Sequence, residues 1–262
     1  MRLAMPSILV FDSGLGGLSV FREIVSARPD ADYLYVADDD FFPYGDHSEA
    51  ELIDRVPAVI GGLIDTHSPD LIVLACNTAS TLVLPQLRAR FSVPFVGTVP
   101  AIKPACASSK SKLVSVLGTE ATVKREYTQG LIRDFGQDCE VTLVGSGTLA
   151  SIAEAALRDE VVDDAAIASE IAPCFVEVNG RRTDVVVLAC THYPLLIDRL
   201  RRLAPWPVDW LDPAPAIAAR VANLIGAAVA DLPGTRRAIF SSGEPPSPGL
   251  AATLARFGLD AG

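Results

Sequence analysis

One seven-residue segment occurs twice in this chain, and it constrains the fold more than any other feature. Asp70-Leu-Ile-Val-Leu-Ala-Cys76 and Asp184-Val-Val-Val-Leu-Ala-Cys190 align without a gap, 114 residues apart. Two other apolar runs have counterparts at offsets of 106 and 108 residues, in the same order along the chain. Three matched segments in one order predict two related halves.

Short apolar runs alternate with amphipathic segments in both halves. The runs are apolar on both faces, which is typical of strands buried on both sides of a parallel sheet. They lie at Ser7–Phe11, Tyr33–Ala37, Leu71–Ala75, Pro94–Gly97, Lys112–Leu117, Val141–Val144 and Val185–Ala189. The amphipathic segments lie at Leu18–Ala27, Ser48–Thr66, Thr78–Arg90, Thr122–Phe135 and Leu195–Leu203. This order predicts an α/β fold of two pseudo-symmetric domains, each a mainly parallel sheet flanked by helices.

Composition limits the kind of partner. The chain has 262 residues, with 22 Lys and Arg against 32 Asp and Glu, for a formal charge of −10. A net negative charge works against nucleic acid or an anionic membrane as the main partner, so we expect a small-molecule ligand. The five cysteines include no Cys-x-x-Cys pair, and no leader or membrane-spanning run is evident. We therefore expect reduced thiols, no metal site and a cytoplasmic protein.

Two of the cysteines stand apart from the other three. Cys76 and Cys190 occupy equivalent positions in the repeat, each directly after a buried strand and before an expected helix. Ligands of open α/β sheets bind at the carboxyl ends of the strands, and a thiol at a helix N-terminus has a lowered pKa. These two thiols are therefore candidates for a base or a nucleophile. Cys106, Cys139 and Cys174 are expected to be core thiols.

Two thiols on opposite faces of one carbon could invert it. If the two halves face each other across a cleft, one thiolate removes a proton and the opposite thiol returns one. Asp12 and His192 are the nearest candidates to orient or tune the thiols. Hydroxyls and amides that could stabilise the developing negative charge lie at Ser13, Asn77, Thr78, Thr122 and Thr191.

The segment Gly14–Ser19 offers a competing interpretation. It follows a strand and opens a helix, and Asp38 lies 24 residues after Gly14, which approximates a dinucleotide-binding fingerprint. Ser19 replaces the third glycine, and Asp12 places a carboxylate where the pyrophosphate would lie. A tight glycine turn is the simpler interpretation.

Six sequence blocks in a common order resemble the glutamate racemase family, the cofactor-independent branch of the aspartate/glutamate racemase superfamily. The blocks span nearly the whole chain and lie at Phe11–Val20, Pro43–Gly45, Ala75–Ser80, Val99–Ile102, Leu117–Val123 and Leu188–Leu196. The resemblance implies interconversion of L- and D-glutamate by a two-cysteine, two-base proton transfer at Cα. It also implies that no cofactor is needed and that the product supplies peptidoglycan synthesis.

The resemblance also assigns roles and boundaries. Cys76 and Cys190 resemble the catalytic thiols, assisted by Asp12, His192 and Glu154. The positions that resemble the substrate-binding set are Ser13, Tyr44, Gly45, Asn77, Thr78, Thr122 and Thr191. In this family the second domain is inserted into the first, which implies a first domain of residues 1–98 plus 211–262 and a second of residues 99–210. The active site would lie in the cleft between them.

Two segments depart from the family pattern. Ala37-Asp-Asp-Asp-Phe41 stands where the family has close to Gly-Asp-Thr-Ala-Arg, and Gly145-Ser-Gly147 replaces Ala-Cys-Pro. A racemase for a related amino acid such as aspartate, and a non-catalytic binding or regulatory member of the fold, remain as alternatives. A homodimer is the assembly to be tested.

Overall fold

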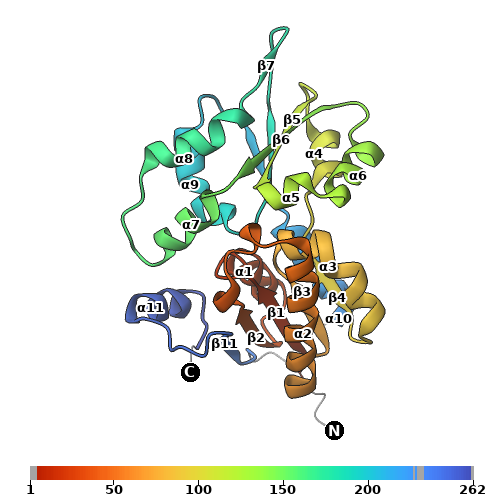
Figure 1. Ribbon diagram of the computed structural model, residues 1–262, viewed down its shortest axis with the longest axis vertical. Helices are drawn as coiled ribbons and strands as arrows, with labels where there is room; N and C mark the ends of the chain where they lie inside the picture. Colours follow the sequence, from red (N-terminus) through yellow and green to blue (C-terminus); the bar gives the residue numbers. More distant parts are fainter. Residues whose placement is uncertain (1–4, 227, 229–232, 261–262) are drawn as a thin grey trace. The chain divides into compact units, whose positions relative to one another are not determined.

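A computed structural model describes residues 5–226, 228 and 233–260 and divides into two compact units (Figure 1). Unit 1 comprises Met1–Thr98 and Ala214–Gly262, and unit 2 comprises Val99–Pro213. Within the described ranges, every helix is too short or too polar to span a bilayer.

Unit 1 is built on a five-stranded parallel sheet. Its strands are β1 (Ser7–Asp12), β2 (Asp32–Ala37), β3 (Leu71–Leu74), β4 (Phe95–Gly97) and β11 (Arg236–Phe240), in the order β11-β2-β1-β3-β4. Its helices are α1 (Leu18–Ala27), α2 (Glu49–His67), α3 (Asn77–Arg90), α10 (Ala214–Ile225) and α11 (Pro248–Arg256). Two short 3-10 turns, η1 (Asp39–Phe41) and η2 (Tyr44–Asp46), follow β2.

Both faces of the unit 1 sheet are buried, as the continuous apolar runs predict. Phe11 and Val36 pack with residues of α2 and α3 in one core. On the other face, the ring of Phe21 in α1 meets Tyr33 and Tyr35 of β2 edge-on, with ring centroids 5.5 and 5.9 Å apart. Burial of apolar side chains on both faces stabilises the sheet and fixes the loops at its carboxyl edge.

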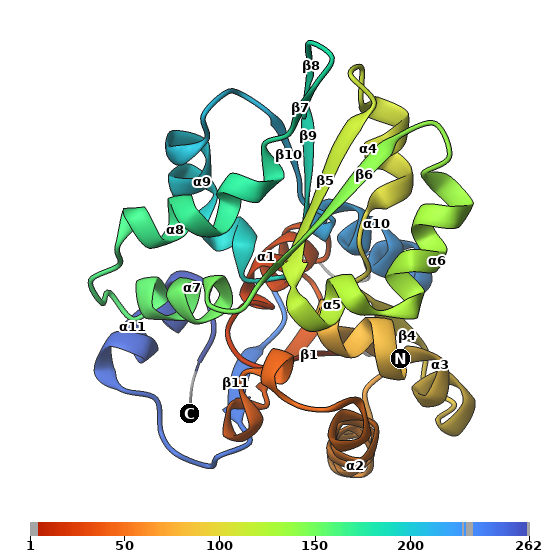
Figure 2. The same ribbon diagram turned by 45° about the horizontal axis from the view of Figure 1, so that its top comes forward.

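Unit 2 contains a four-stranded parallel sheet and a small hairpin. The strands are β5 (Leu113–Thr119), β6 (Glu140–Ser146), β9 (Val185–Ala189) and β10 (Asp209–Leu211), in the order β10-β9-β5-β6. The helical elements are α4 (Ile102–Ser108), α5 (Glu120–Lys124), α6 (Glu126–Phe135), α7 (Leu149–Leu157), α8 (Asp164–Ile171), η3 (Ala172–Cys174), η4 (Tyr193–Leu196) and α9 (Ile197–Leu203). The hairpin of β7 (Glu177–Val178) and β8 (Arg181–Arg182) extends past the amino-terminal end of β9 (Figure 2).

The two sheets share one strand order. The order β2-β1-β3-β4 in unit 1 corresponds to β6-β5-β9-β10 in unit 2, and β11 extends only the first sheet. The repeated segments Asp70–Cys76 and Asp184–Cys190 therefore supply the third strand of each unit. The predicted fold class, two related parallel α/β domains, is confirmed in this respect.

One predicted helix is divided in two. The segment Thr122–Phe135 was expected to be continuous, but Arg125 has an extended backbone (φ −63°, ψ 139°) between α5 and α6. The hydroxyl of Thr128 donates to the carbonyl of Thr122 at 2.7 Å and closes this corner. Amphipathic periodicity continues across the break because both helices face the same sheet, so the sequence pattern did not reveal it.

Candidate active-site residues in each unit

Cys76 lies at the carboxyl end of β3 and caps the 14-residue helix α3. Its side chain is buried, and the thiol donates to the hydroxyl of Ser13 with an Sγ to Oγ distance of 3.7 Å. A group at this position faces the free amides and the positive end of the helix dipole, which favour a thiolate. The expectation of a helix N-terminus at Cys76 is confirmed.

Asp12 organises the glycine turn after β1. Its buried carboxylate accepts hydrogen bonds from the backbone N–H groups of Gly14 at 3.2 Å and Gly17 at 3.0 Å. A Cβ atom at Gly17 would lie only 2.8 Å from the Cβ of Asp12, so the close approach requires glycine. The carboxylate occupies the amides that a pyrophosphate would need, which removes the support for a dinucleotide site.

Asn77 and Thr78 begin helix α3 and are both buried. Neither the amide nitrogen nor the amide oxygen of Asn77 has a hydrogen-bond partner among the described residues. Buried amides are normally paired, because an unpaired one carries a desolvation cost of about 1–3 kcal/mol. Such a group at the carboxyl edge of a parallel sheet is typical of a ligand-binding side chain.

Tyr44 and Gly45 lie in the turn η2 after β2. The buried Tyr44 hydroxyl donates to Oδ2 of Asp38 at 2.6 Å. Burial, followed by the negative charge of Asp38, raises the pKa of Tyr44 far above its usual value, so the phenol stays protonated. Unit 1 therefore contains seven of the predicted site residues, all at or beyond the carboxyl ends of β1, β2 and β3. They are Asp12, Ser13, Tyr44, Gly45, Cys76, Asn77 and Thr78.

Cys190 lies at the carboxyl end of β9, in the position of unit 2 that corresponds to Cys76. Its Sγ is 3.7 Å from Nδ1 of His192, and Nε2 of His192 is 3.1 Å from Oε1 of Glu154. Oε2 of Glu154 accepts a hydrogen bond from Arg158 at 2.8 Å. Cys190, His192 and Glu154 are all buried, so these four side chains form a continuous chain from a thiol to a half-exposed guanidinium.

The expectation of a helix directly after Cys190 is wrong. Thr191 and His192 follow it, and the next element is the four-residue 3-10 turn η4, with α9 beginning only at Ile197. So short a turn has a small dipole. The group that can stabilise a thiolate at Cys190 is therefore the imidazole of His192 and not the N-terminus of a helix.

Thr122 and Thr191 complete the predicted residues of unit 2. Thr122 is buried in α5, where its N–H donates to Oγ1 of Thr119 at 3.1 Å and its Oγ1 accepts from the same hydroxyl at 2.9 Å. Thr191 is buried between Cys190 and His192. Both threonines follow carboxyl ends of strands, β5 and β9, as predicted.

The remaining cysteines are structural. Burial raises the pKa of Cys174 to about 12, and burial together with the neighbouring Cys139 raises that of Cys106 to about 12. The half-buried Cys139 thiol donates to the carbonyl of Cys106 at 3.6 Å. Thiols that stay protonated at neutral pH are poor nucleophiles.

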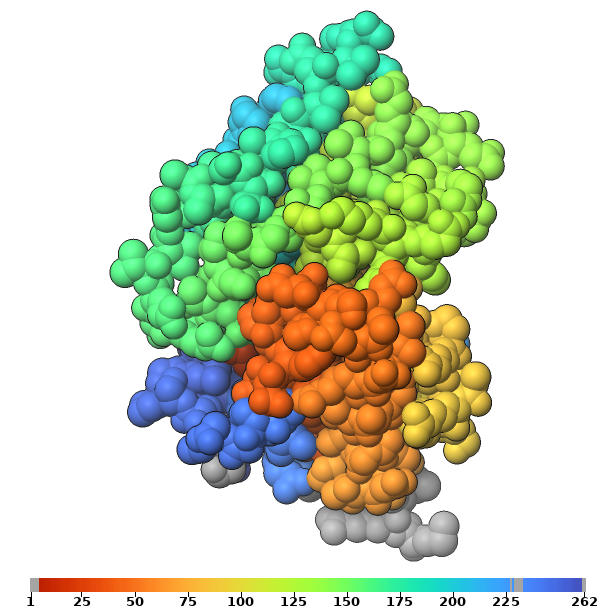
Figure 3. Space-filling model, in the orientation of Figure 1, coloured from red at the N-terminus to blue at the C-terminus, as the bar shows by residue number. Residues whose placement is uncertain are grey.

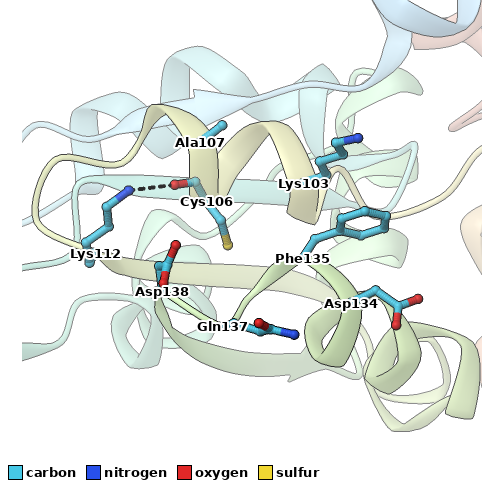
Figure 4. A pocket seen from close by; sticks show the side chains of 8 residues that line it. All are labelled: Lys103, Cys106, Ala107, Lys112, Asp134, Phe135, Gln137 and Asp138. Atoms are coloured by element: carbon cyan, nitrogen blue, oxygen red, sulfur yellow. Dashed lines mark hydrogen bonds between the residues drawn. The ribbon is translucent and has the colours of Figure 1, made fainter.

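A cavity of about 360 Å³ lies in unit 2 near the amino-terminal ends of β5 and β6 (Figure 4). Its lining residues are Lys103, Cys106, Ala107, Lys112, Asp134, Phe135, Gln137 and Asp138. The ammonium group of Lys112 donates to the carbonyl of Cys106 at 3.0 Å. None of the predicted site residues lines this cavity, which lies at the end of the sheet opposite to Cys190.

Sequence reasoning missed two arginines that contact site residues. Arg158 lies four residues after Glu154, a helical spacing that could have suggested the pair. Arg55 contacts Asp38, which is 17 residues away, and no local spacing reveals that contact. Within the described ranges, no group of three or more His, Cys, Asp or Glu side chains is arranged to hold a metal ion.

Comparison with known proteins gives consistent matches. The sequence profile described as Asp/Glu/Hydantoin racemase matches residues 8–221. The glutamate racemase of Brucella canis is 58% identical over 221 residues, covering 84% of this chain and 80% of that protein. That of Sinorhizobium fredii is 55% identical over 244 residues, covering 92% and 91%. The crystal structure of Escherichia coli glutamate racemase, in complex with L-glutamate and the activator UDP-MurNAc-ala, has a TM-score of 0.85 and 39% identity, covering 97% of this chain and 96% of that one.

Proposed function

The chain belongs to the Asp/Glu/Hydantoin racemase family and is an isomerase with the glutamate racemase activity of its relatives; from this premise we propose that it inverts glutamate with two cysteines and no cofactor. Cys76 and Cys190 are the proposed bases. The observation that carries the proposal is their equivalent position, at the carboxyl end of the third strand of two sheets with the same strand order. The mechanism requires the two units to present these thiols to opposite faces of one α-carbon.

The proton balance of the proposed step is simple. One thiolate takes the α-proton as the C–H bond breaks, and the opposite thiol gives its proton to the other face of the carbon. The acceptor thiolate becomes a thiol and the donor thiol becomes a thiolate, so each turnover leaves the site ready for the opposite enantiomer. No oxidant, reductant or metal enters this balance.

The two thiolates would be generated in different ways. We propose that the α3 N-terminus and the Ser13 hydroxyl stabilise the Cys76 thiolate. For Cys190, the proposed acceptor of the thiol proton is Nδ1 of His192. The carboxylate of Glu154 would then stabilise the resulting imidazolium through Nε2.

The proposed substrate contacts come from both units. The buried amide of Asn77 supports this role most directly, because its polar atoms have no partner among the described residues. The other proposed binding residues are Ser13, Tyr44, Gly45, Thr78, Thr122 and Thr191. Amide and hydroxyl donors around the α-carboxylate would stabilise the negative charge that develops as the α-proton leaves.

We also propose a cellular role: D-glutamate made in the cytoplasm is used in peptidoglycan synthesis. The names of the relatives support the production of D-glutamate, and the UDP-MurNAc-ala activator of the Escherichia coli enzyme supports a link to cell-wall synthesis. The formal charge of −10 argues against a nucleic-acid partner. The homodimer is a separate proposal, and light scattering on the purified protein tests it.

Racemisation in deuterated water tests the mechanism. Purified protein, treated with chelator and with no added pyridoxal phosphate, should abolish the circular dichroism of either glutamate enantiomer. In early turnovers deuterium should enter the product enantiomer, while deuterium in both enantiomers would indicate a single base. Cys76→Ser and Cys190→Ser should each abolish racemisation, and Cys139→Ser should retain it.

Two outcomes would replace the proposal. Loss of optical activity with aspartate but not with glutamate would move the assignment to a related amino acid. A folded protein that inverts neither substrate would favour a non-catalytic binding role.

A further inference from the structure

Three consecutive aspartates follow strand β2, and each has a defined contact within unit 1. The carboxylate of Asp39 accepts from the hydroxyl of Ser242 at 2.7 Å and from its backbone N–H at 3.0 Å. Asp40 lies 3.6 Å from a guanidinium nitrogen of Arg55. Asp38 is fully buried and makes the strongest contacts of the three. Asp38 and Asp39 are therefore held to the rest of unit 1 by hydrogen bonds, whereas the Asp40 side chain is 61% exposed.

Arg55 of helix α2 holds Asp38 at two points. Its terminal nitrogen donates to Oδ1 at 2.6 Å, and its Nε donates to Oδ2 at 3.1 Å. Two parallel N–H to oxygen bonds fix the plane of the carboxylate as well as its position, which a lysine cannot do. The side chain of Arg55 is 29% exposed, whereas that of Asp38 is 0% exposed, so the guanidinium lies between the Asp38 carboxylate and the solvent.

The same carboxylate holds Tyr44. The phenol hydroxyl of Tyr44 donates to Oδ2 of Asp38, with an oxygen-to-oxygen distance of 2.6 Å. Because this hydrogen is committed to Asp38, the phenol oxygen can only accept a further hydrogen bond. The orientation of Asp38 therefore sets both the direction of the Tyr44 ring and the hydrogen-bonding character of its oxygen.

Aromatic packing supports Arg55 on its outer side. The guanidinium carbon lies 5.3 Å from the centroid of the Phe41 ring, and that ring stacks on His47 with centroids 3.6 Å apart. Phe41 stands in the segment where the family pattern has an arginine, and the cation that contacts Asp38 in this chain comes from α2. Helix α2 and the segment before it, orange in Figure 3, form part of the surface of unit 1.

We propose that Arg55 is a positioning residue for the racemisation, acting through Asp38 to fix the Tyr44 phenol at the substrate. The inference rests on the proposed function only for the role of Tyr44. Arg55 itself touches neither substrate nor thiol in this scheme.

The charge state of Asp38 gives a readout that a purely structural role of Arg55 would not change. Burial of Asp38 acts to raise its pKa, but hydrogen bonds from Arg55, Tyr44 and Ser241 outweigh burial and hold the pKa below its usual value. Without the guanidinium, the hydrogen bonds and the positive charge of Arg55 no longer lower the pKa of Asp38, so this pKa would rise. A protonated Asp38 could donate to Tyr44, which would change the phenol from acceptor to donor.

A double-mutant cycle in kcat/KM tests the proposal. Arg55→Met should lower kcat/KM about 10- to 100-fold, since a misplacement of about 1 Å can have an effect of this size. Arg55→Lys keeps the charge and loses the two-point contact, so its effect should be intermediate. In a Tyr44→Phe background the same changes at position 55 should alter kcat/KM by less than about threefold, because the phenol is already absent.

The pH profile gives the second readout. In Arg55→Met the acidic limb of kcat/KM should move to higher pH, because Asp38 takes up a proton there, and the shift should vanish when Tyr44→Phe is added. Arg55→Lys carries the test if Arg55→Met does not fold. Arg22→Met, which removes an exposed arginine paired with Glu23, is the matched control.

The outcomes separate this inference from the proposed function. Arg55 does not act through Tyr44 if the losses of kcat/KM from the two single variants multiply in the double variant. The same conclusion follows if the Arg55 variants keep the wild-type kcat/KM and pH profile. If the wild-type protein does not racemise glutamate, or if Cys76→Ser racemises it as fast as wild type, the proposed function fails instead.

Discussion

Nε2 of His192 lies 3.1 Å from Oε1 of Glu154, with both side chains buried. A carboxylate at this distance selects the tautomer with hydrogen on Nε2, which leaves Nδ1 to accept a proton from the Cys190 thiol 3.7 Å away. The arrangement can therefore hold either a neutral thiol and imidazole or a thiolate and imidazolium. Arg158, which donates to the second oxygen of Glu154, keeps the carboxylate in place.

Glu154→Gln should lower kcat/KM on the order of 10²-fold, because an amide stabilises an imidazolium far less than a carboxylate does. The two enantiomers of glutamate have equal free energies, so the loss must be the same in both directions. Circular dichroism assays started from each enantiomer measure it. Glu177→Gln, on the exposed β7–β8 hairpin, should have no effect. Unchanged kinetics in Glu154→Gln would exclude the relay.

Asn77→Ala should raise the KM for glutamate about tenfold while changing the free energy of unfolding by less than about 1 kcal/mol, because the Asn77 amide makes no hydrogen bond to the described residues. Ser80→Ala, in the same helix, should have the opposite pattern, a loss of stability, because it removes hydrogen bonds within the protein. The Ser80 hydroxyl donates to the Leu74 carbonyl at 2.9 Å and accepts from the Thr98 N–H at 3.0 Å. Its loss should destabilise the fold by about 1–3 kcal/mol. Thermal unfolding and steady-state kinetics distinguish the two, and strong destabilisation by Asn77→Ala would argue against a ligand role.

Gly17→Ala should both destabilise unit 1, by about 1–3 kcal/mol, and reduce activity, because the new methyl group displaces Asp12. Gly62→Ala supplies the contrast within helix α2. A Cβ atom there meets nothing within 4 Å, so the substitution should stabilise the helix by about 0.5–1 kcal/mol. Urea unfolding of the two variants checks the signs. A stabilising Gly17→Ala would mean that the turn is less tightly packed.

Alkylation of the native protein at pH 8 should spare Cys106 and Cys174. Their pKa values of about 12 leave a thiolate fraction on the order of 10⁻⁴ at that pH. The unfolded thiols ionise near pH 8.5, so the unfolded state loses protons first and stability should fall as pH rises from about 9 towards 12. Mass spectrometry of iodoacetamide-treated peptides measures the first effect and denaturant titrations at pH 8 and 10 the second. Rapid native labelling of Cys174 would contradict its assignment to the core.

The elements that the sequence revealed are those whose signal is local. The seven apolar runs became strands, and the segments at their carboxyl ends carry the predicted site residues other than Glu154, which lies in α7. Strands β10 and β11 were missed because the first has three residues and the second begins with Arg236 and Arg237, so neither forms a continuous apolar run. Both lie at sheet edges, where only part of a strand is buried.

The contacts that the sequence did not reveal join residues without a fixed spacing. The identity of the two thiols follows from the repeat, and Tyr44 and Glu154 follow from family resemblance. Asp38 follows β2, whereas Arg55 lies about two turns after the N-cap of α2. Hydrophobic periodicity does not indicate that two such positions meet. Cys190 is followed by the short turn η4 and not by a longer helix, and the side chains of Tyr193 and Leu196 in this turn are buried in the core of unit 2.

The shared strand order has a consequence for how the site could be tuned. Two identical copies of one such unit would surround both thiols with the same neighbours. In a single chain that carries both units, a substitution beside Cys76 leaves the neighbours of Cys190 unchanged. Ser13 and a helix terminus could therefore accumulate beside one thiol while an imidazole and a carboxylate accumulated beside the other. Fusion of the two units thus makes the surroundings of the two thiols, the proposed bases, separately adjustable.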